Sequence, residues 1–133
     1  MDPTHLSELA ALEETYWWHV AKRELIIQLL KQHAPPPGRL IEGGVGAGGN
    51  LAAFAELGYE VTGMDALPEA VELCRARGLS QVRQHDLEQP WPYQGQEMDV
   101  AILLDVIEHC HDPIAVLQHA RAAVRPGGCV IVS

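Results

Sequence analysis

Length, composition and charge describe an acidic protein of ordinary globular type. The chain has 133 residues, of which 47% are hydrophobic and 20% charged, and 18 acidic against 9 basic residues give a formal net charge of −9. This length suits one domain with a substantial core, and the acidic balance argues against nucleic-acid partners and anionic membrane surfaces. No leader pattern opens the sequence and no apolar run reaches the ~18 residues of a membrane-spanning helix. We therefore expect a cytoplasmic protein with no membrane or nucleic-acid partner, whose three cysteines remain reduced.

The first 38 residues predict a helical extension. Apolar residues recur at three- and four-residue intervals between positions 4 and 34, which indicates one bent helix or two helices. Pro35, Pro36 and Pro37, followed by Gly38, end this pattern because proline lacks an N–H and disfavours helical geometry before it. We therefore divide the chain into an N-terminal helical extension, 1–38, and a second unit, 39–133.

Residues 39–133 alternate between strand-like and helix-like segments. The expected strands are 39–42, 60–65, 81–86, 99–105 and 129–133, and the expected helices are 50–57, 68–77 and 113–124, with a break at 125–128. The apolar run 99–105, bounded by acids, is typical of a strand buried on both faces of a parallel sheet. This alternation predicts a doubly wound, Rossmann-like parallel α/β sheet.

A glycine-rich loop joins the first expected strand to its helix. Residues 39–50 read RLIEGGVGAGGN, in which Glu42 ends the strand and five glycines fall within the next seven residues. Glycine has no Cβ, so this backbone can approach a small ligand. The loop matches the dinucleotide pattern G-x-G-x-x-G, with Asp65 about 20 residues on, which alone suggests a nicotinamide dinucleotide. Glu42 would place negative charge near a pyrophosphate, however, and therefore favours a ligand that carries positive charge.

Five ordered motifs resemble those of class I S-adenosylmethionine-dependent methyltransferases, in particular the small-molecule type. Within residues 15–133 they are 42–48 (EGGVGAG), 58–65 (GYEVTGMD), 85–87 (HDL), 99–109 (DVAILLDVIEH) and 125–128 (RPGG). The resemblance implies the class I methyltransferase fold and methyl transfer from S-adenosyl-L-methionine to a small-molecule acceptor, with S-adenosyl-L-homocysteine as product. Family members continue past the fifth strand with a helix and a two-strand hairpin, so we expect this chain to lack the C-terminal strands.

The resemblance also assigns cofactor-binding roles by position. The residues near the methionine portion would be Glu42, which faces the amino group, with Gly43, Gly44, Gly46, Gly48, Leu104 and Asp105. Those near the ribose and adenine would be Asp65 for the ribose hydroxyls, Asp86 for the adenine amino group, and Ala66, Leu67 and Leu87 beside the ring.

The aromatic run at 16–19 (YWWH) has two interpretations. Similar N-terminal segments in the family cover the cofactor, with a basic residue downstream, which would give Tyr16, Trp18 and Arg23 a lid role. Aromatic residues at helical spacing are also common in a core, so packing remains an equal alternative.

His109 is the candidate general base, because it follows the fourth strand and an imidazole suits deprotonation of a hydroxyl or amine acceptor. A capping or structural role is the alternative. A metal site at His109, Cys110 and His111 is disfavoured because residues two apart do not share a helix face, so we expect no metal.

Two further functions remain open. The chain could be a cofactor-binding fragment without catalysis, because an acceptor-side wall would be missing, or a nicotinamide-dependent oxidoreductase domain. The fifth strand would also leave an exposed apolar edge, which predicts a homodimer through that edge unless the N-terminal helices cover it.

Overall fold

The computed structural model describes residues 6, 8, 10, 17–95 and 97–133. Its centre is a five-stranded parallel sheet in the order β3-β2-β1-β4-β5. The strands are β1 (Gly38–Gly43), β2 (Tyr59–Asp65), β3 (Val82–Gln84), β4 (Met98–Leu103) and β5 (Val124–Val132). The predicted doubly wound parallel sheet is therefore confirmed.

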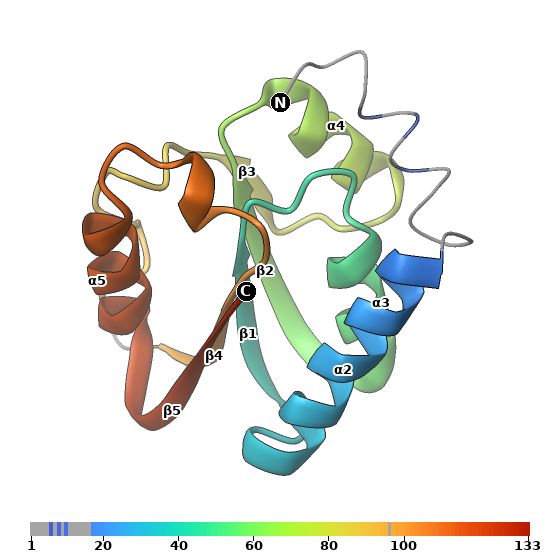
Figure 1. Cartoon of the computed structure of the whole chain (residues 1–133), viewed down its shortest axis with the longest axis horizontal. Helices are drawn as coiled ribbons and strands as arrows, with labels where there is room; N and C mark the ends of the chain where they lie inside the picture. The colour runs from blue at the N-terminus through green and yellow to red at the C-terminus, as the bar shows by residue number, and fades with distance from the viewer. Residues whose placement is uncertain (1–5, 7, 9, 11–16, 96) are drawn as a thin grey trace.

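Helices cover both faces of this sheet (Figure 1). They are α2 (Trp17–His33), α3 (Gly49–Leu57), α4 (Pro68–Ala76), the 3-10 turn η2 (Ile107–His109) and α5 (Pro113–Ala123). Alternate residues of the central strands enter two separate cores: Leu40 and Ile102 pack with α2, α3 and α4, whereas Ile41 and Leu103 pack with α5. This alternation explains why β1 and β4 are apolar on both faces.

The N-terminal helix α2 belongs to the first of these cores. Its buried residues Ile26, Ile27 and Leu30 pack in the same cluster as Leu40 of β1 and Leu51 of α3. Figure 1 shows α2 beside α3, on the opposite side of the sheet from α5. Among the described residues, no helix has the length and apolarity required to cross a bilayer.

Three expected boundaries need correction. β4 ends at Leu103, so the predicted strand 99–105 is two residues too long at its end. β3 is shorter than the predicted 81–86, because only Val82–Gln84 pairs with β2 before the chain turns away. Residues 125–128 follow the end of α5 at Ala123, as predicted, but β5 begins at Val124 and not at the predicted residue 129. Arg125 donates through Nε to Asp99 Oδ1 of β4 and so joins this early part of β5 to its neighbour. The register shifts between Met98 and Val100, so an irregularity in the β4–β5 pairing accommodates the proline and glycines.

Candidate functional site

The predicted site residues lie at the carboxyl edge of the sheet. β1 and β4 are neighbours there, and their following helices, α3 and α5, go to opposite faces, which makes this edge the topological switch point. Glu42 is 2% exposed and lies in register with Gly63 of β2 and Ile102 of β4. Figure 1 shows the glycine loop and η2 above the same edge. A buried carboxylate therefore lies where open α/β sheets bind their ligands.

The glycine loop packs tightly at two positions and is open at a third. Gly44, Gly46 and Gly48 all have positive φ, at 80°, 55° and 86°. A Cβ on Gly44 would lie 2.5 Å from Val106 Cγ2, and one on Gly48 would lie 2.8 Å from Cys74 Sγ. A Cβ on Gly46 would meet no described atom within 4 Å. Gly46 therefore presents bare backbone to open space.

Asp65 connects the end of β2 to this loop. Its Oδ2 accepts a hydrogen bond from Gly46 N–H at 2.9 Å, and its Oδ1 accepts one from Leu67 N–H at 3.0 Å. The Asp65 side chain is half-buried, and the next residue, Ala66, is exposed. Two backbone donors thus fix a carboxylate beside the open face of Gly46.

The segment after β3 places a third acid, Asp86, near this edge. Asp86 is exposed and accepts Glu88 N–H through Oδ1 at 3.0 Å. Leu87 is buried in the core under α5, and its carbonyl oxygen accepts Trp91 Nε1–H at 3.0 Å. Leu104, which follows β4, is buried in the core on the α2 face.

Neighbouring residues of α2 contact two different loops of the site. Lys22 Nζ lies 2.6 Å from Asp105 Oδ2, just after β4, and Arg23 Nε donates to Asn50 Oδ1 at 2.9 Å, at the start of α3. Asp105 has φ 55°, which is uncommon outside glycine. Trp18 is 53% exposed, and Tyr16 lies outside the described residues. Helix α2 therefore contacts both the start of α3, which follows the glycine loop, and the loop after β4.

The loop after β4 presents His109 to solvent. The His109 side chain is 78% exposed, and its Nε2 lies 3.8 Å from Glu108 Oε1. Burial, followed by the charge of Glu88, raises the pKa of the neighbouring Cys110 thiol. No group of three potential metal ligands occurs in the part of the chain that the structure describes.

Several residues at the site were not predicted from the sequence. Lys22 and Asn50 hold α2 in place, Arg77 Nη1 donates to Ala47 O of the glycine loop at 2.8 Å, and Glu88 bonds the backbone that precedes α5. Only Glu88 could have been found from the sequence, because it lies two residues after the predicted site residue Asp86. The other contacts join residues 27 or more positions apart, which no periodicity reveals.

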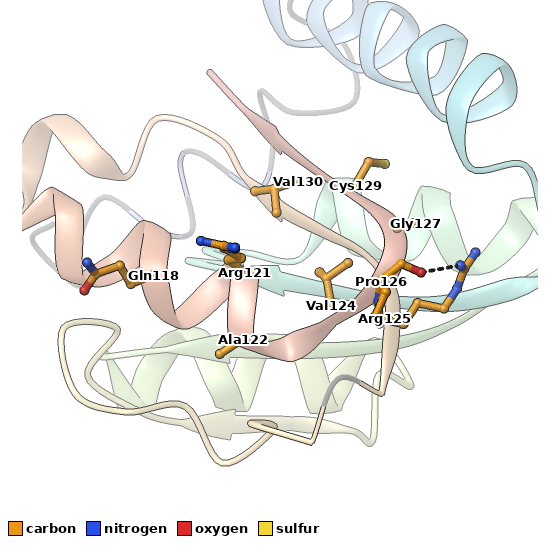
Figure 2. Close-up of a pocket in the computed structure, with 10 residues that line it drawn as sticks. Gln118, Arg121, Ala122, Val124, Arg125, Pro126, Gly127, Cys129 and Val130 are labelled. Atoms are coloured by element: carbon orange, nitrogen blue, oxygen red, sulfur yellow. Dashed lines mark hydrogen bonds between the residues drawn. The ribbon is translucent and has the colours of Figure 1, made fainter.

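A separate cavity lies away from this edge. Its volume is about 580 Å³, and Figure 2 shows its lining side chains on the last turns of α5 and on β5, with Arg121 and Arg125 among them. None of its lining residues belongs to the glycine loop or to the predicted site. The acids and the open glycine meet instead at the carboxyl edge of the sheet.

Comparison with known proteins gives matches over nearly the whole chain. A family model described as a methyltransferase domain matches residues 16–133. A ubiquinone biosynthesis O-methyltransferase of Xanthomonas campestris pv. campestris is 27% identical over 143 aligned residues, covering 98% of this chain and 60% of that protein. The enzyme of the same name from Idiomarina loihiensis is 34% identical over 96 residues, covering 67% of this chain and 40% of its own length. This chain thus spans well under two thirds of the curated relatives it matches.

A solved structure shares the fold. A Methanococcus maripaludis protein, classed as an S-adenosyl-L-methionine-dependent methyltransferase, aligns with a TM-score of 0.83 at 15% identity. The alignment covers 98% of this chain and 63% of that protein. At this identity the likeness shows the fold alone.

Proposed function

The chain belongs to the methyltransferase-domain family, and from this premise we propose that it binds S-adenosyl-L-methionine at the carboxyl edge of its sheet and methylates a small-molecule acceptor. The observation that carries the proposal is the carboxylate of Asp65, held by Gly46 N–H and Leu67 N–H beside the open face of Gly46. A fixed pair of carboxylate oxygens suits a vicinal diol such as that of a ribose, since each hydroxyl needs one acceptor.

The remaining residues of this edge fit the same cofactor. The buried carboxylate of Glu42 suits a ligand that carries sulfonium and ammonium charges, because a buried acid requires a positive partner or hydrogen-bond donors. Gly43, Gly44, Gly46 and Gly48 would lie against the methionine portion together with Leu104 and Asp105, and Asp86 would accept the adenine amino group, with Ala66, Leu67 and Leu87 beside the ring. When bound, the cofactor supplies a methyl group that its sulfonium has already activated.

We place proton removal at His109 Nε2. The relatives' name specifies O-methylation, and a hydroxyl acceptor requires a base, a role that an exposed imidazole after β4 suits. The rest of the chain's contribution is to hold acceptor and methyl donor close and aligned. With catechol as a probe acceptor, His109→Gln should lower kcat without changing the affinity for S-adenosyl-L-homocysteine. An unchanged kcat would remove His109 from the mechanism.

We also assign residues 1–38 the role of a lid over the cofactor, to which Tyr16, Trp18 and Arg23 contribute, while residues 39–133 form the binding domain. The two contacts of α2, Lys22 with Asp105 and Arg23 with Asn50, support this role because they lie on either side of the proposed site.

The compartment and the assembly are proposals as well. The three cysteines are free thiols, which supports a reducing cytoplasm. The edge position of β5 supports self-association of this chain as a homodimer.

Calorimetric titration tests the central assignment. The chain should bind S-adenosyl-L-homocysteine and not NAD⁺, and Asp65→Ala should weaken binding at least about tenfold, because charge-assisted hydrogen bonds contribute roughly 1.5–3 kcal/mol. Glu60→Ala is the matched control, since Glu60 is an exposed acid at the other end of the same strand.

Each rival function has a distinct outcome when this titration is combined with a methyl-transfer assay. Binding of NAD⁺ in place of S-adenosyl-L-homocysteine would establish the oxidoreductase reading. Tight cofactor binding without methyl transfer to any hydroxyl acceptor would establish a binding fragment, and unchanged affinity in Asp65→Ala would remove the ribose assignment.

A further inference from the structure

We propose that Glu88 is a positioning residue that ties the loop 105–112 to the turn bearing Asp86. Cofactor binding at Asp86 would then order the loop that carries His109. This inference rests on the proposed function, because it takes Asp86 as the adenine contact and His109 as the base. It adds a residue to which neither the motifs nor the comparisons give a role.

The carboxylate of Glu88 bonds two successive backbone amides of the loop. Its Oε1 accepts Asp112 N–H at 2.7 Å and its Oε2 accepts His111 N–H at 3.3 Å, across 24 and 23 positions of sequence. Hydrogen bonds to an ionised acceptor are stronger than neutral ones. Asp112 is also the N-cap of α5, where its Oδ1 accepts Ala115 N–H at 3.0 Å. Glu88 therefore fixes the point at which the loop enters α5.

The backbone of Glu88 is held from the other side. Its N–H donates to Asp86 Oδ1 at 3.0 Å, and its carbonyl oxygen lies 3.3 Å from His119 Nε2 of α5. The half-buried Glu88 thus has a backbone hydrogen bond to Asp86, the proposed adenine contact, and side-chain hydrogen bonds to the loop 105–112. A change in the turn at Asp86 is transmitted directly to residues 111 and 112.

Hydrogen bonds hold the loop 105–112 at both of its ends. It starts where Asp105 N–H donates to Ser133 O at 3.2 Å, and it ends at the Glu88 carboxylate. Between these points His109 is held by a local bond, from its N–H to Val106 O at 3.0 Å. Val106, Ile107 and Cys110 also pack against the core under α5. Loss of the Glu88 bonds would therefore loosen the end of the loop that follows His109, and small displacements of a catalytic group are costly.

Hydrogen exchange with S-adenosyl-L-homocysteine as the probe tests the inference on the full 133-residue chain. In the wild type, the ligand should slow exchange both in 86–89 and in 105–112. In Glu88→Ala, ligand protection of 105–112 should fall by about tenfold or more, as expected for loss of a charged acceptor, while protection of 86–89 remains and affinity changes less than about threefold. Glu88→Gln keeps one acceptor oxygen for Asp112 N–H and should retain intermediate protection.

A control variant, the Glu88→Gln variant and the binding of S-adenosyl-L-homocysteine distinguish the outcomes. Glu72→Ala, an exposed acid on α4, should behave as the wild type. Should Glu88→Ala fail to fold, the intermediate protection expected of Glu88→Gln carries the test, and wild-type protection in Glu88→Gln would then overturn the inference. Ligand binding that protects 86–89 but not 105–112 in the wild type would overturn this inference and leave the proposed function intact. Absence of S-adenosyl-L-homocysteine binding would overturn both.

Discussion

At the scale of single residues, the three positive-φ glycines of the loop have different tasks although they look alike in the sequence. Gly44 is closed off by Val106 and Gly48 by Cys74, so both are required by packing inside the protein. Gly46 has no described neighbour at its Cβ position, and its N–H bonds to Asp65. Packing against described residues therefore does not account for the lack of a side chain at Gly46, although its positive φ favours glycine.

This distinction predicts different outcomes for two alanine variants. Gly46→Ala and Gly78→Ala each place alanine at positive φ in open space, at 55° and 90°, so each should lower the free energy of unfolding by about 1–2 kcal/mol. Gly78 follows α4, away from the carboxyl edge. In calorimetry only Gly46→Ala should weaken S-adenosyl-L-homocysteine binding, by at least about tenfold, since its methyl group would occupy cofactor space. Equal affinities in the two variants would contradict a cofactor contact at Gly46.

Sequence reasoning reached the glycines and acids of the site but not their supports. Asp65 and Asp86 follow strands in a motif of fixed spacing, so their placement at one edge could be predicted. The bond from Lys22 to Asp105 joins residues 83 positions apart, and the side chain of Glu88 reaches across 24. Charged side chains show no sequence periodicity that identifies their hydrogen-bond partners, so these contacts could not be predicted from the sequence.

At the scale of elements, the position of α2 depends on apolar burial and on two polar contacts. Ile26, Ile27 and Leu30 fix its inner face to the core, while Lys22 and Arg23 fix its first turns to the loops of the site. The apolar contacts hold the helix against the core, and the polar contacts tie its N-terminal turns to Asp105 and Asn50 at the carboxyl edge of the sheet.

Lys22→Ala should loosen this cover without unfolding the chain. Asp105 is 62% exposed, and exposed ion pairs contribute about 0.2–1 kcal/mol, so we expect roughly a two- to fivefold faster dissociation of S-adenosyl-L-homocysteine, measured by stopped-flow fluorescence. Added salt should reduce the difference, because it screens the pair. Lys31→Ala, an exposed lysine near the other end of α2, is the matched control. Identical dissociation rates in wild type and Lys22→Ala would remove the lid contact.

The other end of the sheet is held by Asp99. Its Oδ1 accepts Arg125 Nε–H and its Oδ2 accepts Arg39 N–H at 2.8 Å, so it joins β4 to β5 and to β1. The hydrogen bond from Arg125, followed by that from Arg39, lowers the pKa of Asp99 below its ordinary value. A carboxyl whose folded pKa is lowered stabilises the fold above its unfolded pKa, and this contribution disappears as the pH falls through the folded pKa.

Asp99→Asn should therefore destabilise the chain in a pH-dependent way. At pH 7 we expect the free energy of unfolding to fall by about 1–2 kcal/mol, since the charged acceptor of Arg125 is lost. The gap to the wild type should begin to close below about pH 4, the ordinary range of an unfolded aspartate, and should narrow further as the pH falls toward the lower pKa of the folded carboxyl. Urea titrations from pH 7 to pH 3 measure this, with Glu60→Gln as an exposed control that also lies near Arg39. A gap that stays constant across this range would contradict the role of the charge.

The same contact explains the element boundary that sequence reasoning missed. The residues 125–128 read Arg-Pro-Gly-Gly, a composition typical of a turn, yet they lie in β5. Asp99 of β4 binds Arg125, and a Cβ on Gly128 would lie 2.6 Å from Asp99 O. The glycine is therefore explained by close approach of two strands, a reason that only the neighbouring strand supplies.

At the scale of the whole molecule, the sheet order separates the binding edge from an exposed side. The order β3-β2-β1-β4-β5 puts the switch point between β1 and β4, so the acids of the site gather at the centre of the carboxyl edge. β5 pairs only with β4 among the described strands and forms one margin of the sheet. The parallel sheet could be predicted because strand-like and helix-like segments alternate along the chain, and because the run 99–105 is apolar throughout, as expected of a strand that buries both faces.

The margin at β5 predicts self-association. Its last apolar residue, Val132, is 38% exposed, and an uncovered strand edge is a template for pairing with another chain. Light scattering should therefore show a dimer of this 133-residue chain, and Val132→Lys should shift it to monomer, because a lysine at the edge opposes strand addition. Ile114→Lys adds the same charge at an exposed site on α5 and should leave the dimer intact. A wild-type chain that stays monomeric at high concentration would show that strand pairing through β5 does not occur, and a dimer that persists in Val132→Lys would place the interface on another surface.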